Sequence, residues 1–169
     1  MKISVFLLGL FSLCILHGCV KKEQMINGKF NGMWKLDKYE VLNSKTNNWT
    51  LYLSFIGHQG LIIYDGHGHM GVHITPVGYS QVNTNVNLDS LNREDLLKLA
   101  KFYQSNYVYF ANYQITDNTI NHNRLSATDP SAWGTTLVRD FEFKNDTLIL
   151  TPRELIDGKQ LRLRWVKLQ

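Results

Sequence analysis

The residues best placed to support chemistry are Arg139 and His122, which lie in segments with strand-like alternation. Leu137, Arg139, Phe141 and Phe143 alternate with polar residues, so they share one face of a predicted strand. If that face is interior, the Arg139 guanidinium is buried among apolar groups. A buried charge is unfavourable unless it is paired, so Arg139 must have a partner.

Two kinds of partner would satisfy Arg139. It could anchor a ligand carboxylate or phenolate, with His122 and Tyr64 nearby as hydrogen-bond partners. Alternatively, it pairs with Asp140, Glu142 or a backbone carbonyl and holds the strands together. We favour the second interpretation.

Three histidines also invite a metal-binding interpretation. His67, His69 and His73 have the same strand parity, and three histidines can hold zinc with one coordination position open. However, His67 falls in a predicted turn, and His73 lies roughly 13 Å further along an extended strand. We therefore expect exposed histidines here, with no metal site and no cofactor.

Nucleophilic catalysis is poorly supported. Ser126, His122 and Asp129 lie close in sequence, but no nucleophile elbow and no glycine-flanked serine is present. We favour a protein without catalytic activity. An isomerase or cyclase that uses His122, Tyr64 and Arg139 as acid, base and anchor is the enzymatic alternative.

A dense aromatic tract precedes these residues. By strand parity half of it faces the core, and the remaining tyrosines could line a pocket, since each has an apolar ring with a polar tip. The candidate ligand-binding residues are Tyr64, Tyr109, Tyr113, His122 and Arg139.

Strands must position these side chains. Residues 61–64 and 69–74 flank an Asp-Gly-His-Gly turn, which predicts a hairpin. Alternating segments continue to the C-terminus, with turns predicted at residues 116–118, 145–146 and 157–158. About eight or nine strands predict an all-β fold, a closed antiparallel barrel, because closure removes exposed sheet edges.

Two features modify this pattern. Residues 34–41 change parity near Lys38, as a bulged strand would. Residues 92–104 form the one predicted helix, with Asn92 as its N-cap. Its apolar face consists of Leu96, Leu99, Ala100 and Tyr103. We expect that face to pack against the core.

The composition of the 169 residues limits the functional classes. A hydrophobic content of 44% and a charged content of 19% suit a globular domain. The net charge of +4 is scattered, without a basic run interleaved with aromatic residues. Nucleic-acid binding is therefore not expected.

The N-terminus carries a targeting pattern. Lys2 precedes an apolar run over residues 3–16, which suits a signal peptide and is short for a membrane span. Residues 16–19 (Leu-His-Gly-Cys) resemble the lipobox of bacterial lipoproteins. That resemblance implies cleavage before Cys19 and lipid on its sulfur and new amino group. The alternative is an ordinary secretory signal that contains a cysteine.

The predicted organisation follows from that cleavage site. Residues 1–18 are a lipoprotein signal peptide, residues 19–31 a tether, and residues 32–169 the barrel domain. With Cys14 removed and Cys19 lipidated, the mature domain has no free thiol and no disulfide. We expect a bacterial membrane lipoprotein that faces the periplasm, with the outer membrane favoured.

The order of landmarks resembles the bacterial and fungal lipocalin-like domain proteins. Residues 32–34 (Gly-Met-Trp) match the G-x-W pattern of the first lipocalin strand. Residues 60–70 resemble the family hairpin G-x-L-I-Y-T-x-D-G-Y-M, with His67 and His69 as departures. After the helix, the remaining landmarks appear in order as Tyr113, His122, Pro130, Trp133-Gly134-Thr135, Arg139 and Leu163-Arg164-Trp165.

The resemblance implies a lipocalin-like (calycin) barrel that often holds a hydrophobic small molecule, but it implies no single activity. We expect non-catalytic binding of a small apolar or amphipathic ligand by a membrane-anchored protein. The second candidate is a protein-binding module, an inhibitor or assembly factor that acts through loops such as residues 75–89. In lipocalins an arginine stacks over the first-strand tryptophan, which predicts Arg162 or Arg164 beside Trp34.

Overall fold

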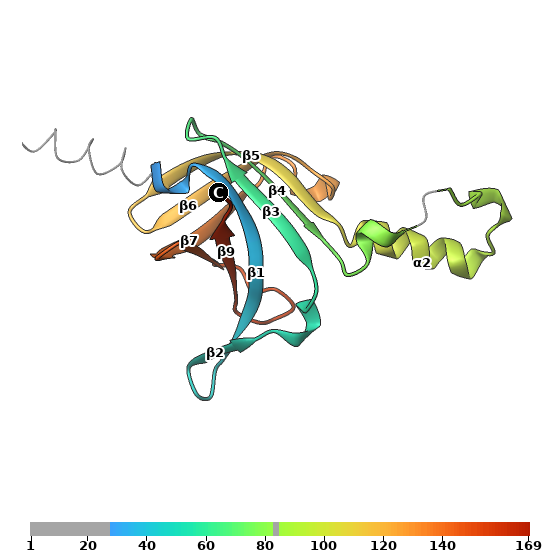
Figure 1. Ribbon diagram of the computed structural model, residues 1–169, viewed down its shortest axis with the longest axis horizontal. Coiled ribbons are helices and arrows are strands. Elements are labelled where there is room, and N and C mark those ends of the chain that lie inside the picture. The colour runs from blue at the N-terminus through green and yellow to red at the C-terminus, as the bar shows by residue number, and fades with distance from the viewer. Residues whose placement is uncertain (1–27, 83–84) are drawn as a thin grey trace, which may run out of the picture.

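The computed structural model describes residues 28–82 and 85–169 (Figure 1). The predicted signal peptide and Cys19 lie outside the described residues. Within the described part, residues 28–30 are helical, and Phe30 is fully buried. Phe30, which lies in the segment predicted as a tether, is therefore part of the barrel core.

An antiparallel sheet closes on itself to form the barrel. The described strands are β1 (Gly32–Asn43), β2 (Asn48–Leu51), β3 (Gln59–Tyr64), β4 (His69–Thr75), β5 (Tyr107–Thr116), β6 (Thr119–Ala127), β7 (Thr136–Lys144), β8 (Thr147–Pro152) and β9 (Leu161–Lys167). They pair in the order β2-β1-β3-β4-β5-β6-β7-β8-β9, and β1 also pairs with β9. The predicted fold class is confirmed: eight strands form the closed barrel, and β2 is an extra strand on β1.

Turn chemistry fixes much of the strand register. Asp117, Asn145 and Asp157 have positive φ angles of 50°, 52° and 52°, a conformation that Asn and Asp tolerate better than most residues. The turns at 117–118 and 145–146 join β5 to β6 and β7 to β8. The predicted bulge is also present, as a register shift between Leu36 and Lys38 where β1 pairs with β9.

Aromatic side chains fill one end of the barrel, called here the closed end. The ring of Phe30 makes edge contacts with Tyr64, Phe141 and Phe143 at centroid distances of 5.1, 5.0 and 4.9 Å. The indole Nε1 of Trp34 donates to the carbonyl of Phe30 at 2.8 Å. These contacts tie the start of the described chain to the core and seal this end against water.

The cation beside Trp34 differs from the prediction. β1 and β9 are neighbours, and Trp34 is buried, as expected. However, the group over its ring is Lys167, whose Nζ lies 5.1 Å from the ring centroid. Arg162 lies instead over the Trp49 ring. The register of β9 causes the difference, because Lys167 is the residue paired with Trp34.

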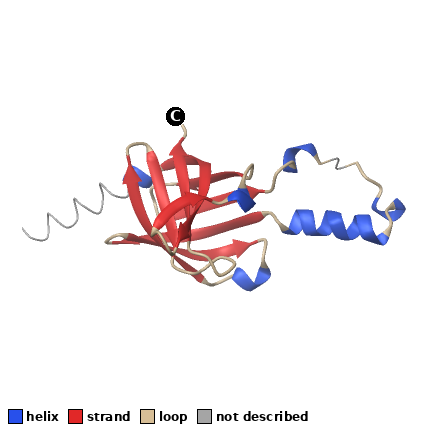
Figure 2. Ribbon diagram, turned by 90° about the horizontal axis from the view of Figure 1, so that it is seen from below, coloured by secondary structure: helices blue, strands red, loops and turns tan. Residues whose placement is uncertain are grey.

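Helix α2 (Arg93–Gln104) has the predicted length, and the Asn92 side chain caps it by accepting from the Asp95 amide at 2.9 Å. The expectation that its apolar face packs on the core is wrong. No residue of α2 is buried, and the helix projects from the barrel with the short 3₁₀ turns Tyr79–Gln81 and Leu88–Ser90 (Figure 2). Helical spacing shows that the helix is amphipathic but not what its apolar face contacts. The barrel is closed by its own strands, so its core does not need the helix as a cover.

Among the described residues, helix α2 is joined to the barrel through contacts at its base. Tyr79 stacks on Phe102 and contacts Tyr103 edge-on, while His73 of β4 contacts Tyr79. None of the described helices is long and apolar enough to span a membrane.

Candidate ligand cavity

A cavity of about 350 Å³ occupies the end of the barrel opposite the aromatic closed end. Its wall is mostly apolar and includes Ile62, Val72, Ile74, Leu137, Leu150 and Leu163. These residues come from five strands and point inward by strand alternation. The polar groups at the wall are few, which is typical of small-molecule sites in proteins.

Arg139 is the charged group in this wall that the sequence singled out, and it points inward as predicted. Its Nη1 lies 2.6 Å from Oε1 and 2.8 Å from Oε2 of Glu154, and 3.2 Å from the Val138 carbonyl. Arg139 pairs with Pro152, the last residue of β8, so Glu154 follows within reach. Of the partners considered from the sequence, a backbone carbonyl is present, but the two acids are paired elsewhere: Asp140 with Arg153 and Glu142 with Lys144.

The two members of this pair differ in exposure. The Arg139 side chain is 10% exposed, whereas that of Glu154 is 44% exposed. Both carboxylate contacts use Nη1, so Nε and Nη2 of Arg139 donate to no described group. Arg124 also lines the cavity. Two guanidinium groups against one carboxylate give this end of the cavity a positive balance that favours an anionic ligand group.

Two other polar atoms in the cavity wall have no partner. Nδ1 of His58 and Nε1 of Trp165 are buried without a hydrogen bond to any described residue, and both residues line the cavity. An unpaired buried polar atom costs about 1–3 kcal/mol, and such atoms in native proteins call for an explanation. Neither atom is accessible to water, so the two are a local cost of this wall rather than contacts for a ligand.

His122 lies in a polar layer between the cavity and the closed end. Its Nδ1 lies 2.7 Å from the Tyr109 hydroxyl, and its Nε2 lies 3.1 Å from the Tyr64 hydroxyl. A neutral imidazole has one donor and one acceptor nitrogen, so one phenol donates to it and the other accepts. Burial, and secondarily the Arg139 charge, lowers the pKa of His122 to about 3. Burial also raises the pKa of both phenols well above their usual value.

Comparison with known proteins identifies the family to which this barrel belongs. The lipocalin-like domain family matches residues 31–167. The chain belongs to the lipocalin-like domain family. No curated protein matches the sequence. Among solved structures, a mutant of the fluorescent protein UnaG is similar, with 12% identity and a TM-score of 0.39 over 84% of this chain and 98% of that one.

The lipocalin-like barrel distributes the five candidate residues among three places. Tyr109 and Arg139 line the cavity. Tyr64 and His122 lie behind the wall, joined to it through the Tyr109 hydroxyl. Tyr113 packs edge-on against Tyr64 and lines a hollow at the hairpin turn of the closed end. Of the five candidate residues, only Tyr109 and Arg139 can therefore touch a ligand in this cavity.

Sequence reasoning missed four polar residues of this lipocalin-like cavity: His58, Arg124, Glu154 and Trp165. Glu154 had a usable signal. The turn at 145–146 fixes the register of β7 and β8, which places Pro152 opposite Arg139 and Glu154 just beyond it. Trp165 was visible as part of the closing Leu-Arg-Trp motif. His58 carried no local signal, because its place depends on the chain between β2 and β3.

Proposed function

We propose that this lipocalin-like domain binds, without catalysis, a small amphipathic molecule with an acidic group such as a carboxylate or phenolate. The observation that carries the proposal is the cavity, whose apolar wall ends at Arg139, where two donor nitrogens bond no described group. Its volume of about 350 Å³ is at the lower end of the range for ligand pockets. A ligand with a short apolar body and one anionic group fits this combination of size and chemistry.

The cavity itself gives a matched test of the proposal. Leu137 points into the cavity, while Val138 is the next residue of the same strand and points outward. Leu137→Trp should fill the cavity and reduce binding of the co-purified ligand fraction at least about tenfold, which is 1.4 kcal/mol. Val138→Trp should leave binding unchanged. Mass spectrometry of bound small molecules and titration of the stripped protein measure this, and equal binding by both variants would exclude the cavity as the site.

The enzymatic alternative has less support. An acid–base enzyme needs titratable groups within hydrogen-bond reach in an open pocket. His122 has the reach, but both its nitrogens are bonded to phenols and the ring is fully buried. Its pKa of about 3 keeps it neutral and a weak base at neutral pH. The arrangement is better suited to holding the barrel interior together.

Helix α2 supports a second candidate function, a protein-binding module. Leu96, Leu97 and Tyr103 of the helix are 39%, 51% and 40% exposed, and exposed apolar residues on one element can form a protein-binding surface. A charge at Leu97, as in Leu97→Glu, should then weaken association with the partner and leave ligand binding unchanged. If Leu97→Glu instead weakened ligand binding and left partner association unchanged, the helix would contribute to the ligand site and not to a protein-binding surface.

We further propose that lipid on Cys19 anchors the protein to a bacterial membrane, with the barrel facing the periplasm. The lipobox resemblance supports this, as does the position of the barrel directly after the tether. Cys19→Ala should remove lipid labelling and either release the protein from the membrane fraction or leave an uncleaved precursor. Unchanged lipid labelling of the variant would overturn the anchor. Met1 to Gly18 remain in place if cleavage fails, which intact-mass measurement detects.

A further inference from the structure

One side of the barrel carries apolar side chains on its outer surface. Strands β9, β1, β3, β4 and β5 are consecutive neighbours there (Figure 1). The outer apolar face consists of Met33, Leu61, Ile63, Phe110, Val166 and Leu168, with exposed fractions of 39%, 45%, 44%, 58%, 41% and 41%. An antiparallel sheet with a solvated outer face usually alternates apolar inside with polar outside, so these strands break that rule.

Register makes the outer apolar face continuous. Met33 pairs with Ile63, Ile63 with Gly71, and Gly71 with Phe110, which forms one row across four strands. The Phe110 ring lies over Gly71, with ring carbons 2.9 and 3.0 Å from the position that a Cβ would occupy. At the other end of the row, the Leu168 amide donates to the Met33 carbonyl at 2.8 Å.

The opposite side of the barrel has a different character. On β7, Asp140 pairs with Arg153 at 2.8 Å and Glu142 pairs with Lys144 at 3.2 Å. These charges are exposed and satisfy one another, as expected for a surface that faces water. Exposed apolar side chains also occur singly elsewhere, such as Leu125 of β6 and Trp133, but the register-linked row lies on the β9-β1-β3-β4-β5 side.

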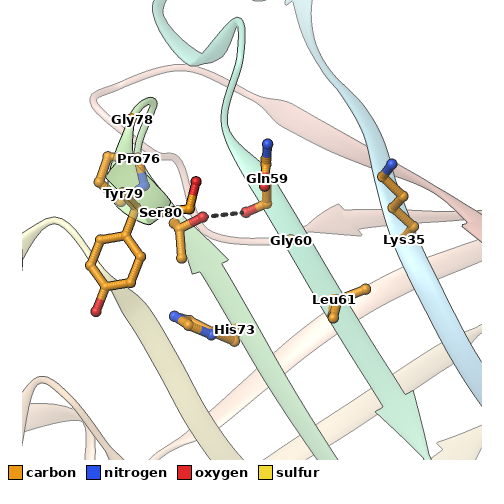
Figure 3. A pocket seen from close by; sticks show the side chains of 10 residues that line it. Lys35, Gln59, Gly60, Leu61, His73, Pro76, Gly78, Tyr79 and Ser80 are labelled. Atoms are coloured by element: carbon orange, nitrogen blue, oxygen red, sulfur yellow. Dashed lines mark hydrogen bonds between the residues drawn. The ribbon is translucent and has the colours of Figure 1, made fainter. Parts of the chain in front are cut away.

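The outer apolar face also contains a cationic group. Lys35 lies in the second row, paired with Leu61 and Val166, and has no acidic partner among the described residues. Figure 3 shows Lys35, Leu61 and His73 on three neighbouring strands, with Tyr79 beside His73. Two shallow hollows of about 350 and 250 Å³ share Leu61 and His73. The surface therefore combines apolar side chains with an unpaired positive charge.

We infer that this face rests on an anionic lipid surface. Apolar side chains with lysines among them are the combination that binds membrane interfaces. The position of the chain supports the choice of partner. Met33 follows the first described residues closely, and residues 20–27 would span at most about 30 Å from the proposed lipid on Cys19 to the barrel.

This inference rests on the proposed lipid anchor, because the anchor would hold the barrel close to the membrane. The outer apolar face runs along the barrel side, so a barrel lying on it keeps its cavity clear of the bilayer. The anchor supplies attachment, and the face fixes orientation. Docking on this face leaves the cavity wall untouched, so ligand binding and docking can be measured independently.

The test uses the full chain reconstituted into vesicles of phosphatidylcholine with or without phosphatidylglycerol. An environment-sensitive fluorophore is attached through Ile63→Cys on the outer apolar face, or through Glu142→Cys on the charged side as the matched control. The labelled native chain gives the background from its own cysteines. With phosphatidylglycerol, the label at position 63 should shift to the blue and be quenched by brominated lipid several-fold more than the label at 142. Adding Lys35→Glu should reduce both effects.

Three results would overturn the inference. Equal solvent exposure of both labels in vesicles means that the barrel does not rest on this face. A blue shift at position 63 without vesicles that grows with protein concentration means that a second copy covers it. Equal burial of both labels means a non-specific interaction. Failure of the anchor is seen separately as loss of the unlabelled chain from the vesicle fraction, and failure of ligand binding as loss of the bound small molecule.

Discussion

His122→Phe is expected to destabilise the protein at neutral pH and to remove much of its acid sensitivity. The ring of His122 is fully buried, and its nitrogens hold the hydroxyls of Tyr64 and Tyr109. Phenylalanine has a similar shape but no ring nitrogen, so both phenol hydroxyls lose a buried partner. At about 1–3 kcal/mol for each of the two unsatisfied hydroxyls, we expect a loss of roughly 2–6 kcal/mol in the free energy of unfolding.

The pH dependence follows from the lowered pKa of His122. The ordinary value is 6.5, and burial, with the Arg139 charge, lowers it to about 3 in the folded protein. Above pH 6.5 both states are neutral, so the stability is fully present. Between pH 6.5 and 3 the unfolded state takes up a proton that the folded state does not. The free energy of unfolding therefore decreases as the pH is lowered through this window, by up to roughly 5 kcal/mol. The variant His122→Phe lacks this loss.

Denaturant unfolding at neutral pH and at about pH 4 checks both expectations. The gap between native protein and His122→Phe should narrow as the pH falls. His67→Gln is the matched control, because His67 is exposed in the β3–β4 turn, and it should follow the native curve. A gap that stays constant across this range would show that protonation of His122 does not contribute to acid unfolding.

The barrel was predictable because local signals and closure agree. Two-residue turns with Asn or Asp set the register of β5 with β6 and of β7 with β8. The parity change near Lys38 anticipated the bulge in β1. Once register and alternation are set, the inward direction of Arg139 follows. Each of these features depends on residues that are close in sequence.

The failures share one physical cause, which is dependence on distant parts of the chain. The packing of α2 depends on where the connections between β4 and β5 place the helix relative to the barrel, which helical spacing does not encode. The cation over Trp34 depends on the register of β9 against β1, which joins opposite ends of the domain. Phe30 was assigned to the tether because its neighbours are polar, although its ring completes the closed end.

The Arg139–Glu154 pair should respond unequally to loss of its two members. Glu154→Gln removes the negative charge that compensates the 10% exposed guanidinium, while the Gln amide oxygen and the Val138 carbonyl can still accept its hydrogen bonds. An uncompensated buried charge is costly, and partial access to the cavity limits the loss to about 1–3 kcal/mol of unfolding free energy. Arg139→Leu leaves the half-exposed Glu154 carboxylate, which water can solvate, so the loss should stay below about 1 kcal/mol.

Ligand binding should change in the opposite order. In the empty cavity Glu154 holds Nη1 and neutralises the guanidinium, so it competes for Arg139 with the anionic group of a ligand that binds through Nε and Nη2. Glu154→Gln should therefore strengthen binding of a medium-chain carboxylate by about tenfold, while Arg139→Leu should weaken it by at least as much. The alcohol of the same chain length should bind both variants and the native protein similarly. Asp140→Asn, which breaks an exposed pair with Arg153, is the control for surface charge. If Glu154→Gln changed neither stability nor carboxylate affinity, Glu154 would not be the group that an acidic ligand displaces, and the anionic part of the ligand would have to be placed elsewhere in the cavity.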